Sequence, residues 1–178
     1  IEEIAALTRN TDSVFVVDAI TALGALPIPM DKWGIDVLVA GSQKAFMLPA
    51  GLAFIALSQK AWAIAEKATC PRFYFDLRRE RAANANGESY FSSAVTHIRA
   101  LDLVLEIFLQ RGLEQVHRRI QALSTATLSC AREFGLQIYP DKPSPSLSAI
   151  CVPAGIDGQA ARTNMEKNAG IVVMGGQD

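Results

Sequence analysis

Two side chains of opposite charge stand where strand-like runs of the sequence end. Asp18 closes the β-branched run 13–17 (SVFVV), and Lys44 follows the apolar run 35–40 (IDVLVA) after the tripeptide GSQ at 41–43. In parallel α/β sheets, ligands gather beyond the carboxyl ends of the strands. We therefore expect both side chains to converge on one crevice.

An aspartate and a lysine in such a crevice are compatible with three arrangements. They could form a buried ion pair that holds the sheet together. They could also form an acid/base pair that acts on a small substrate, or a Schiff-base lysine with an anionic partner for a pyridine nitrogen. Residue types and spacing alone do not choose among the three.

Motifs for several other chemistries are missing from the sequence. His97 and His117 lie far apart and form no HExxH zinc motif, and there is no GxSxG, P-loop or GxGxxG motif. The three cysteines, at 70, 130 and 151, form no CxxC pair and are odd in number. This pattern argues against a disulfide framework or zinc ribbon and favours a reducing cytoplasm. We predict no metal site.

Composition places the chain among ordinary globular proteins. Of its 178 residues, 50% are hydrophobic and 20% charged, which excludes a disordered or collagen-like chain. The net charge is −1 without blocks of like charge, so binding to nucleic acid or an anionic membrane is not expected. Neither of the longest apolar stretches, 14–30 and 45–57, reaches the roughly 18 uncharged residues that a membrane span requires.

The pattern of apolar residues predicts the elements that position Asp18 and Lys44. We expect strands over 13–17, 35–40, 52–57, 147–152 and 171–173. We expect helices over 1–9, 58–69, 94–110 and 113–134, and a further helix that begins near 157. Ser58 is a predicted N-cap and Gly135 a predicted C-cap. Residues 71–93 are expected to form a loop with helical patches. Because the chain starts at Ile1 and stops just after a strand-like run, we expect it to be the middle of a longer protein.

The amino-acid sequence of these segments resembles that of the class V aminotransferases of the alanine/serine–glyoxylate type. The resemblance runs in order through 16–24 (VVDAITALG), 30–37 (MDKWGIDV), 41–45 (GSQKA), 49–53 (PAGLA), 72–77 (RFYFDL), 91–95 (FSSAV) and 112–114 (GLE). It implies a fold type I enzyme that depends on pyridoxal 5′-phosphate (PLP). The implied fold is α/β, with part of the large-domain, mostly parallel sheet in 1–112 and the start of a smaller α+β C-terminal domain in 113–178.

The resemblance also implies roles for individual residues. Lys44 matches the lysine that forms the Schiff base with PLP, and Asp18 matches the aspartate that pairs with the pyridine nitrogen; these two are the predicted catalytic residues. Ile20 would pack under the ring, and Gln43 would bind the phosphate. Ser92 aligns with a threonine that reaches the phosphate bound by the other subunit, although Ser93 replaces the proline that follows it in the family. We interpret Ser42 as a positioning residue or a cofactor contact.

The implied reaction is transamination between alanine or serine and an oxo acid such as glyoxylate or pyruvate, in a homodimer. Two alternatives stay open. One is another class V activity such as cysteine desulfurase, whose members carry a histidine where this chain has Gln43. The other is a non-catalytic fragment that keeps the fold for dimerisation, and joint retention of Asp18, Gln43 and Lys44 argues against it.

Overall fold

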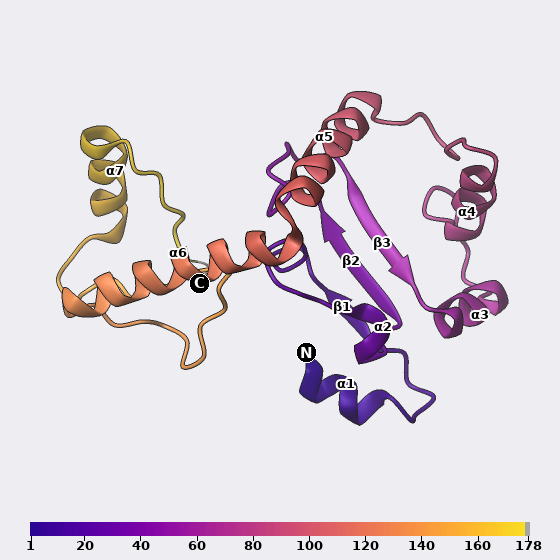
Figure 1. Cartoon of the computed structure of the whole chain (residues 1–178), viewed down its shortest axis with the longest axis horizontal. Coiled ribbons are helices and arrows are strands. Elements are labelled where there is room, and N and C mark those ends of the chain that lie inside the picture. The colour runs from indigo at the N-terminus through magenta and orange to yellow at the C-terminus, as the bar shows by residue number, and fades with distance from the viewer. Residues whose placement is uncertain (177–178) are drawn as a thin grey trace. The chain divides into compact units, whose positions relative to one another are not determined.

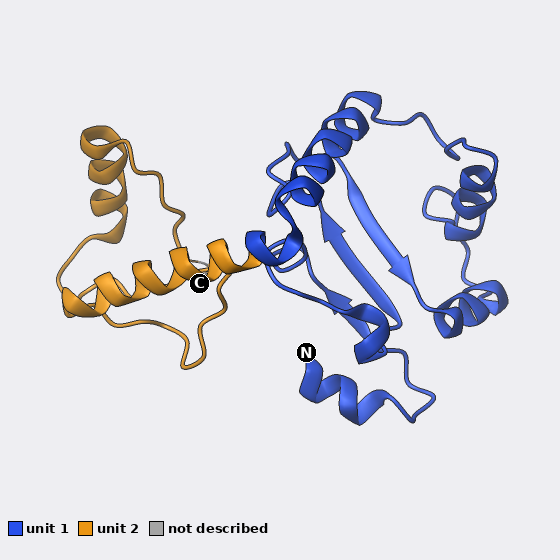
Figure 2. Ribbon diagram, in the orientation of Figure 1, with its two compact units in different colours: residues 1–116 blue, residues 117–178 orange. Residues whose placement is uncertain are grey.

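The computed structural model describes residues 1–176. Two compact units divide the chain, Ile1–Val116 and His117–Asp178 (Figure 2). The division falls inside a long helix. The domains that we expect over 1–112 and 113–178 stay a prediction, and residues 177–178 lie outside the described residues.

The first unit is built on a small mixed sheet (Figure 1). Its strands are β1 (Val16–Asp18), β2 (Val37–Gly41) and β3 (Ala53–Leu57), in the order β1-β2-β3. β1 runs parallel to β2, whereas β3 is antiparallel to it. The three predicted strands and the α/β class are therefore confirmed, with one parallel and one antiparallel pair among the described strands.

Two short helices pack beside the sheet, α1 (Glu2–Thr8) and α2 (Met30–Trp33). The core beneath them is apolar and consists of Ala5, Phe15, Val17, Ala19, Ile35 and Leu38. Alternation along β1 explains this arrangement, because Val17 is buried while Val16 and Asp18 on either side are exposed. The residue that closes β1 is thus directed away from the core.

Asp36, at the entrance to β2, ties three segments of the first unit together. Its carboxylate accepts the Phe15 N–H at 2.9 Å and the Ser58 hydroxyl at 2.8 Å, and lies 3.4 Å from the Lys60 ammonium. Burial raises the pKa of Asp36, but these hydrogen bonds and the Lys60 charge outweigh burial and lower the pKa below its ordinary value. Lys60 also donates to the Thr11 carbonyl, which fixes the approach to β1.

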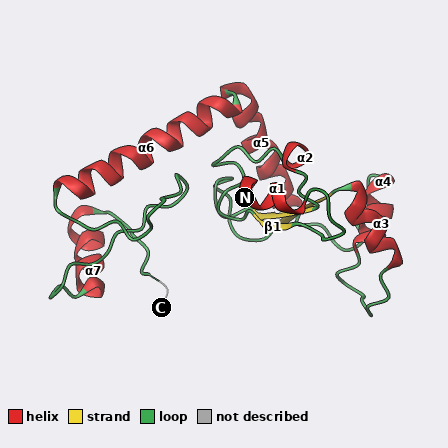
Figure 3. Cartoon of the chain, turned by 90° about the horizontal axis from the view of Figure 1, so that it is seen from below, coloured by secondary structure: helices red, strands yellow, loops and turns green. Residues whose placement is uncertain are grey.

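Three helices follow the sheet, α3 (Gln59–Lys67), α4 (Leu77–Ala85) and α5 (Val95–Arg111) (Figure 3). Ser58 caps α3 by accepting the Ala61 N–H at 3.1 Å, as predicted from its type and position. α5 confirms the long helix expected over 94–110, and α4 is the helical patch of the segment expected to be mainly loop.

The second unit contains most of α6 (Leu113–Glu133) and α7 (Gly158–Ala169). α6 ends in a Schellman turn, because Gly135 has φ +71° and the Leu136 N–H reaches the Ala131 carbonyl at 2.9 Å. Asp157 caps α7 through hydrogen bonds to the N–H groups of Gln159 and Ala160. No helix within residues 1–176 is long and apolar enough to cross a membrane.

The strands expected over 147–152 and 171–173 are wrong for the described residues. Only an isolated antiparallel bridge joins Ile138 to Ile150. After α7, the Ile171 N–H closes the helix on the Met165 carbonyl, and the Val173 carbonyl accepts a hydrogen bond from Arg162. Two backbone groups of this apolar run therefore bond to α7 and not to a neighbouring strand.

Candidate functional site

Lys44 lies in the connection between β2 and β3, here called the lysine loop (residues 42–52). β2 ends at Gly41, and the chain must reverse direction because β3 pairs antiparallel to β2. Gln43 and Lys44 are exposed, whereas Ala40, Gly41 and Ser42 before them are buried. The polar pair therefore leaves the sheet at the point where the strand stops.

Ser42 closes the lysine loop on itself. Its side chain is fully buried, and its hydroxyl donates to the Pro49 carbonyl at 2.7 Å and accepts the Leu52 N–H at 3.2 Å. The backbone adds two bonds, from the Ser42 N–H to the Leu52 carbonyl and from the Leu48 N–H to the Ser42 carbonyl, both 3.1 Å. Four hydrogen bonds thus fix the residue two positions before Lys44. Both hydrogen bonds of the Ser42 hydroxyl are used within the loop.

Phe46 anchors the other side of Lys44 in the core. The ring is buried, packs edge-on against Phe54 of β3 with centroids 5.1 Å apart, and stacks on Phe108 of α5 at 6.0 Å. Next in the chain, Met47 has φ +56° and donates its N–H to the Lys44 carbonyl at 2.9 Å. A positive φ at a residue other than glycine is uncommon and marks a tight turn. Lys44 is therefore held between a buried serine and a buried phenylalanine.

Asp18 ends β1 on the neighbouring strand. Its register partner on β2 is Val39, and the next N–H, that of Ala19, bonds to the Val39 carbonyl at 2.8 Å. The carboxylate is exposed and accepts the Ile20 N–H at 2.9 Å, which turns the chain and fixes the side chain. Ile20 itself is half-buried.

Five of the six predicted site residues thus lie at the carboxyl ends of β1 and β2. β1 and β2 are parallel, so their carboxyl ends lie at the same end of the sheet. Asp18, which closes β1, and Ile20 lie at the end of one strand, and Ser42, Gln43 and Lys44 follow the other. A carboxylate, an amide and an amine are exposed there on a buried framework. Such a set can neutralise a cationic ring, donate to an anion and attack a carbonyl carbon.

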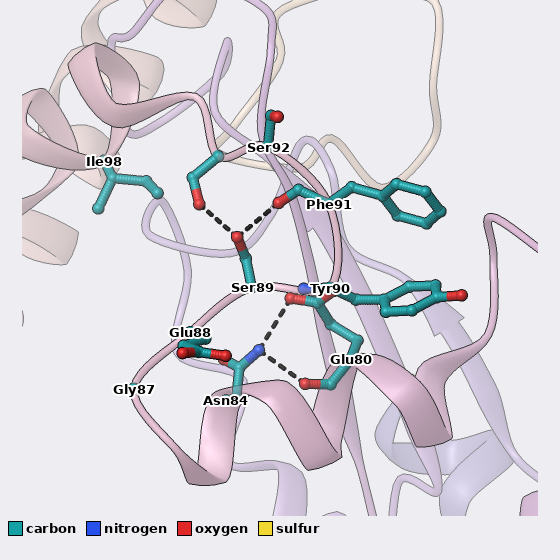
Figure 4. Close-up of a pocket in the computed structure, with 10 residues that line it drawn as sticks. Glu80, Asn84, Gly87, Glu88, Ser89, Tyr90, Phe91, Ser92 and Ile98 are labelled. Carbon is teal, nitrogen blue, oxygen red and sulfur yellow. Dashed lines mark hydrogen bonds between the residues drawn. The ribbon is translucent and has the colours of Figure 1, made fainter.

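Ser92, the sixth residue, lines a different place, an open pocket of about 980 Å³ beside α4 (Figure 4). The pocket is framed by hydrogen bonds: the Ser89 hydroxyl pairs with the Ser93 hydroxyl and donates to the Phe91 carbonyl. Asn84 donates to the carbonyl and carboxylate of Glu80 at 2.8 Å. Asp18, Ile20 and the lysine loop do not line this pocket.

Asp76 in the RFYFDL segment caps α4, the helix whose Glu80 and Asn84 line this pocket. It is buried and caps α4 by accepting the Arg78 N–H at 3.1 Å, and the Arg78, Arg72 and Arg79 guanidinium groups lie 3.2, 3.5 and 3.8 Å from its oxygens. The hydrogen bonds from Arg78 and the neighbouring positive charges hold the pKa of Asp76 below its ordinary value despite burial. The same contact raises the pKa of Arg78. Sequence reasoning found the motif but not this ion cluster.

Phe46 and Asp76 are the supporting residues that sequence reasoning missed. Their signals were present, because Phe46 is a large aromatic residue two positions after Lys44 and Asp76 precedes a helical run as an N-cap would. The described residues contain no group of three or more His, Cys, Asp or Glu side chains that could hold a metal ion. Cys70, Cys130 and Cys151, all within the described part, are free thiols.

Comparison with known proteins gives matches over the whole chain. The family model described as aminotransferase class-V matches residues 1–178. The chain is 37% identical to a protein of Synechococcus sp. named soluble hydrogenase, small subunit, over 100% of this chain and 48% of that protein. It is 36% identical to the L-aspartate–glyoxylate aminotransferase of Paracoccus denitrificans, over 87% of this chain and 41% of that enzyme.

Solved structures agree in fold. The aspartate aminotransferase of subgroup IV from Thermus thermophilus superposes with a TM-score of 0.91 at 30% identity, over 99% of this chain and 50% of that one. The pyridoxamine–pyruvate aminotransferase of Mesorhizobium loti gives a TM-score of 0.93 at 26% identity, over 99% of this chain and 47% of that one. The chain spans about half the length of the curated relatives it matches.

Proposed function

We propose that this chain, which belongs to the aminotransferase class V family, carries the lysine and the aspartate of a PLP-dependent aminotransferase. One observation carries the proposal above all. Asp18 and Lys44 are exposed beyond the carboxyl ends of two adjacent parallel strands, in a chain that the family model matches throughout. This is the place where open α/β sheets bind their ligands.

The exposed groups fit PLP by their chemistry. The Lys44 amine can bond to the aldehyde carbon, the Asp18 carboxylate can accept the N–H of the protonated pyridine, and the Gln43 amide can donate to a phosphate. Ile20 offers an aliphatic side chain to the ring. A different residue set, such as a carboxylate in place of Gln43, would repel the phosphate rather than bind it.

Each residue then has a defined task in transamination. When bound, PLP supplies an electron sink for the pair left when the substrate Cα loses its proton. Asp18 keeps the proton on the ring nitrogen. Lys44 would hold the cofactor covalently, and its free amine would take up and return the Cα proton. Ser42 acts indirectly, by fixing the loop that presents Lys44.

The proposed substrates are a small amino donor and a short oxo acid. With alanine and glyoxylate, the amino group leaves alanine, which becomes pyruvate, and reaches glyoxylate, which becomes glycine; serine would give hydroxypyruvate. Relatives named serine–glyoxylate aminotransferase, in Methylorubrum extorquens at 31% identity, and L-aspartate–glyoxylate aminotransferase support glyoxylate as acceptor. They also add aspartate to the donors worth testing.

We also propose that the protein works as a homodimer in the cytoplasm. The distribution of the predicted phosphate ligands supports a dimer, since Ser92 lines its own pocket while Gln43 lies in the lysine loop. A Ser92 that serves the site of a second subunit accounts for this separation. The free state of the three cysteines accords with a reducing compartment.

The test is glycine formation by the full-length protein with PLP, glyoxylate and alanine, serine or aspartate in turn. We expect turnover with at least one donor, and Lys44→Ala should lose it by about a thousandfold or more, since the group acts in the reaction itself. Lys67→Ala, which removes an exposed lysine of α3, is the matched control and should keep full activity. Turnover unaffected by Lys44→Ala, or sulfide release from cysteine without any glycine, would contradict the proposal.

A further inference from the structure

One face of α5 meets the lysine loop at two points, about three helical turns apart. His97, Leu101, Val104 and Phe108 follow the i, i+4, i+7, i+11 spacing that places residues on one side of a helix, and all four are buried or half-buried. Leu103, 61% exposed, and Leu109, 74% exposed, lie off this face. The face touches the loop at two places that follow Lys44 in the chain, Phe46 and Gly51.

Phe108 makes the contact near the C-terminal end of α5. It stacks on Phe46, two residues after Lys44, at 6.0 Å. A methyl group at Gly24 would meet Ala45 at 3.1 Å and Phe108 at 3.5 Å, so this corner is closely packed. The contact is wholly apolar and needs no further explanation than core packing.

His97 makes the contact near the N-terminal end of α5, and it is closer. A methyl group at Gly51 would lie 2.8 Å from Nε2, 3.0 Å from Cδ2 and 3.3 Å from Cε1 of His97. The edge of the imidazole therefore occupies the space that any other residue at 51 would need. Gly51 has φ +156°, a conformation that residues with a side chain rarely adopt.

The buried nitrogen of His97 has no hydrogen-bond partner within the described residues. A buried polar atom without a partner costs free energy, so the hydrogen-bonding capacity of His97 does not explain its place. What the ring does supply is a flat edge that fits against a backbone without a Cβ. His97 acts on the loop through its shape.

The contact is transmitted to Lys44 in two steps. Gly51 precedes Leu52, and Leu52 exchanges hydrogen bonds with Ser42 in both directions, through its N–H at 3.2 Å and its carbonyl at 3.1 Å. Ser42 in turn precedes Lys44 by two residues. A shift of Gly51 must therefore move or break the bonds that hold the start of the lysine loop.

We propose that His97 is a positioning residue for Lys44, which locks the lysine loop by wedging its ring against Gly51. The proposal rests on the proposed function only for the role of Lys44, because the lock itself is a property of the loop. It predicts that removing the contact between the His97 ring and Gly51 makes the lysine loop more mobile without unfolding the sheet.

The experiment compares His97→Ala with His97→Leu, which keeps the volume and removes the unpaired nitrogen, and with Thr96→Ala as an exposed control on the same helix. The first readout is amide hydrogen exchange in the full-length protein without PLP. His97→Ala should speed exchange at Leu48 and Leu52 by about tenfold, within the range of coupling between contacting residues. His97→Leu, Thr96→Ala and the β2 amides of all variants should stay unchanged.

A second variant tests the contact itself. Gly51→Ala introduces a methyl group where the imidazole lies and should also speed amide hydrogen exchange in the lysine loop. The effect should be smaller in the His97→Ala background, because the imidazole that the methyl group would meet is gone. Additive effects of the two substitutions would overturn the wedge. So would unchanged loop exchange in His97→Ala, or faster exchange throughout the sheet.

The last readout tests whether the contact between His97 and Gly51 affects the reactivity of Lys44. The rate at which borohydride fixes PLP on Lys44 should fall in His97→Ala by a factor similar to the loss of exchange protection, and recover in His97→Leu. An unchanged rate with a loosened loop would overturn the positioning role. If the wild-type protein fixes no PLP on Lys44, the proposed function fails, while the exchange results still decide whether the lock exists.

Discussion

Ser42 offers the most direct test of how the lysine loop is held. Replacing it with alanine removes a hydroxyl that is fully buried and makes two hydrogen bonds, to the Pro49 carbonyl and from the Leu52 N–H. Each such bond contributes about 1 kcal/mol, so Ser42→Ala should lower the free energy of unfolding by about 2 kcal/mol. Leu52 is a half-buried residue, so its N–H finds no equal replacement, whereas Pro49 is an exposed residue whose carbonyl can bond to water.

The assay is urea unfolding of the full-length protein, followed by fluorescence of Trp33 and Trp62, both in the first unit. Ser13→Ala is the control, because Ser13 is exposed and such surface changes stay within about 0.5 kcal/mol. If Ser42→Ala is as stable as Ser13→Ala, the hydroxyl does not tie the loop and the reasoning is wrong. A larger loss in Ser42→Thr would be consistent with the full burial of the site, since an added methyl group has no room.

Three further outcomes follow from the packing of the first unit. Phe46→Ala should cost about 3–5 kcal/mol in urea unfolding and Phe46→Leu clearly less, because the first empties a ring-sized space; equal losses would contradict the aromatic anchor. The pKa of Asp36 is lowered from 3.8 in the folded state. The contribution of Asp36 to the free energy of unfolding is therefore fully present above pH 3.8 and is lost as the pH falls through the lower pKa of the folded state. Asp36→Asn should therefore be less stable than wild type at pH 7 and lose less stability between pH 5 and 2, and parallel acid-unfolding curves would refute this. Ser58→Ala removes both the α3 cap and a bond to Asp36 and should cost about 1–2 kcal/mol, measured by thermal unfolding against the exposed control Ser13→Ala.

Local patterns predicted most of the framework of the first unit. The strands, the cap at Ser58 and the long helix α5 follow from apolar periodicity and from turn residues, which act over a few positions. The errors lie where a run of apolar residues needs a distant partner. The run 171–173 looks like a strand, yet its backbone bonds to α7 instead. Whether a run becomes a strand depends on a neighbour that its own sequence does not encode.

The candidate site shows the same division. The ends of β1 and β2 identify Asp18 and Lys44 from sequence, because parallel strands bring their carboxyl ends together by rule. The packing that supports them was not predictable, since His97 and Gly51 meet only through the placement of α5 against the loop. Such contacts depend on tertiary structure, and a lone histidine in a helix carries no signal for them.

The central claim, that Lys44 holds the cofactor, is tested most directly by borohydride reduction of the PLP-loaded, full-length protein followed by tryptic peptide mapping. Trypsin does not cleave at a reduced, modified lysine, so the account predicts the label in one peptide spanning residues 33–60, uncut at Lys44. The label should be absent from Lys44→Arg. Label distributed over surface lysines, or retained in full by Lys44→Arg, would contradict the account.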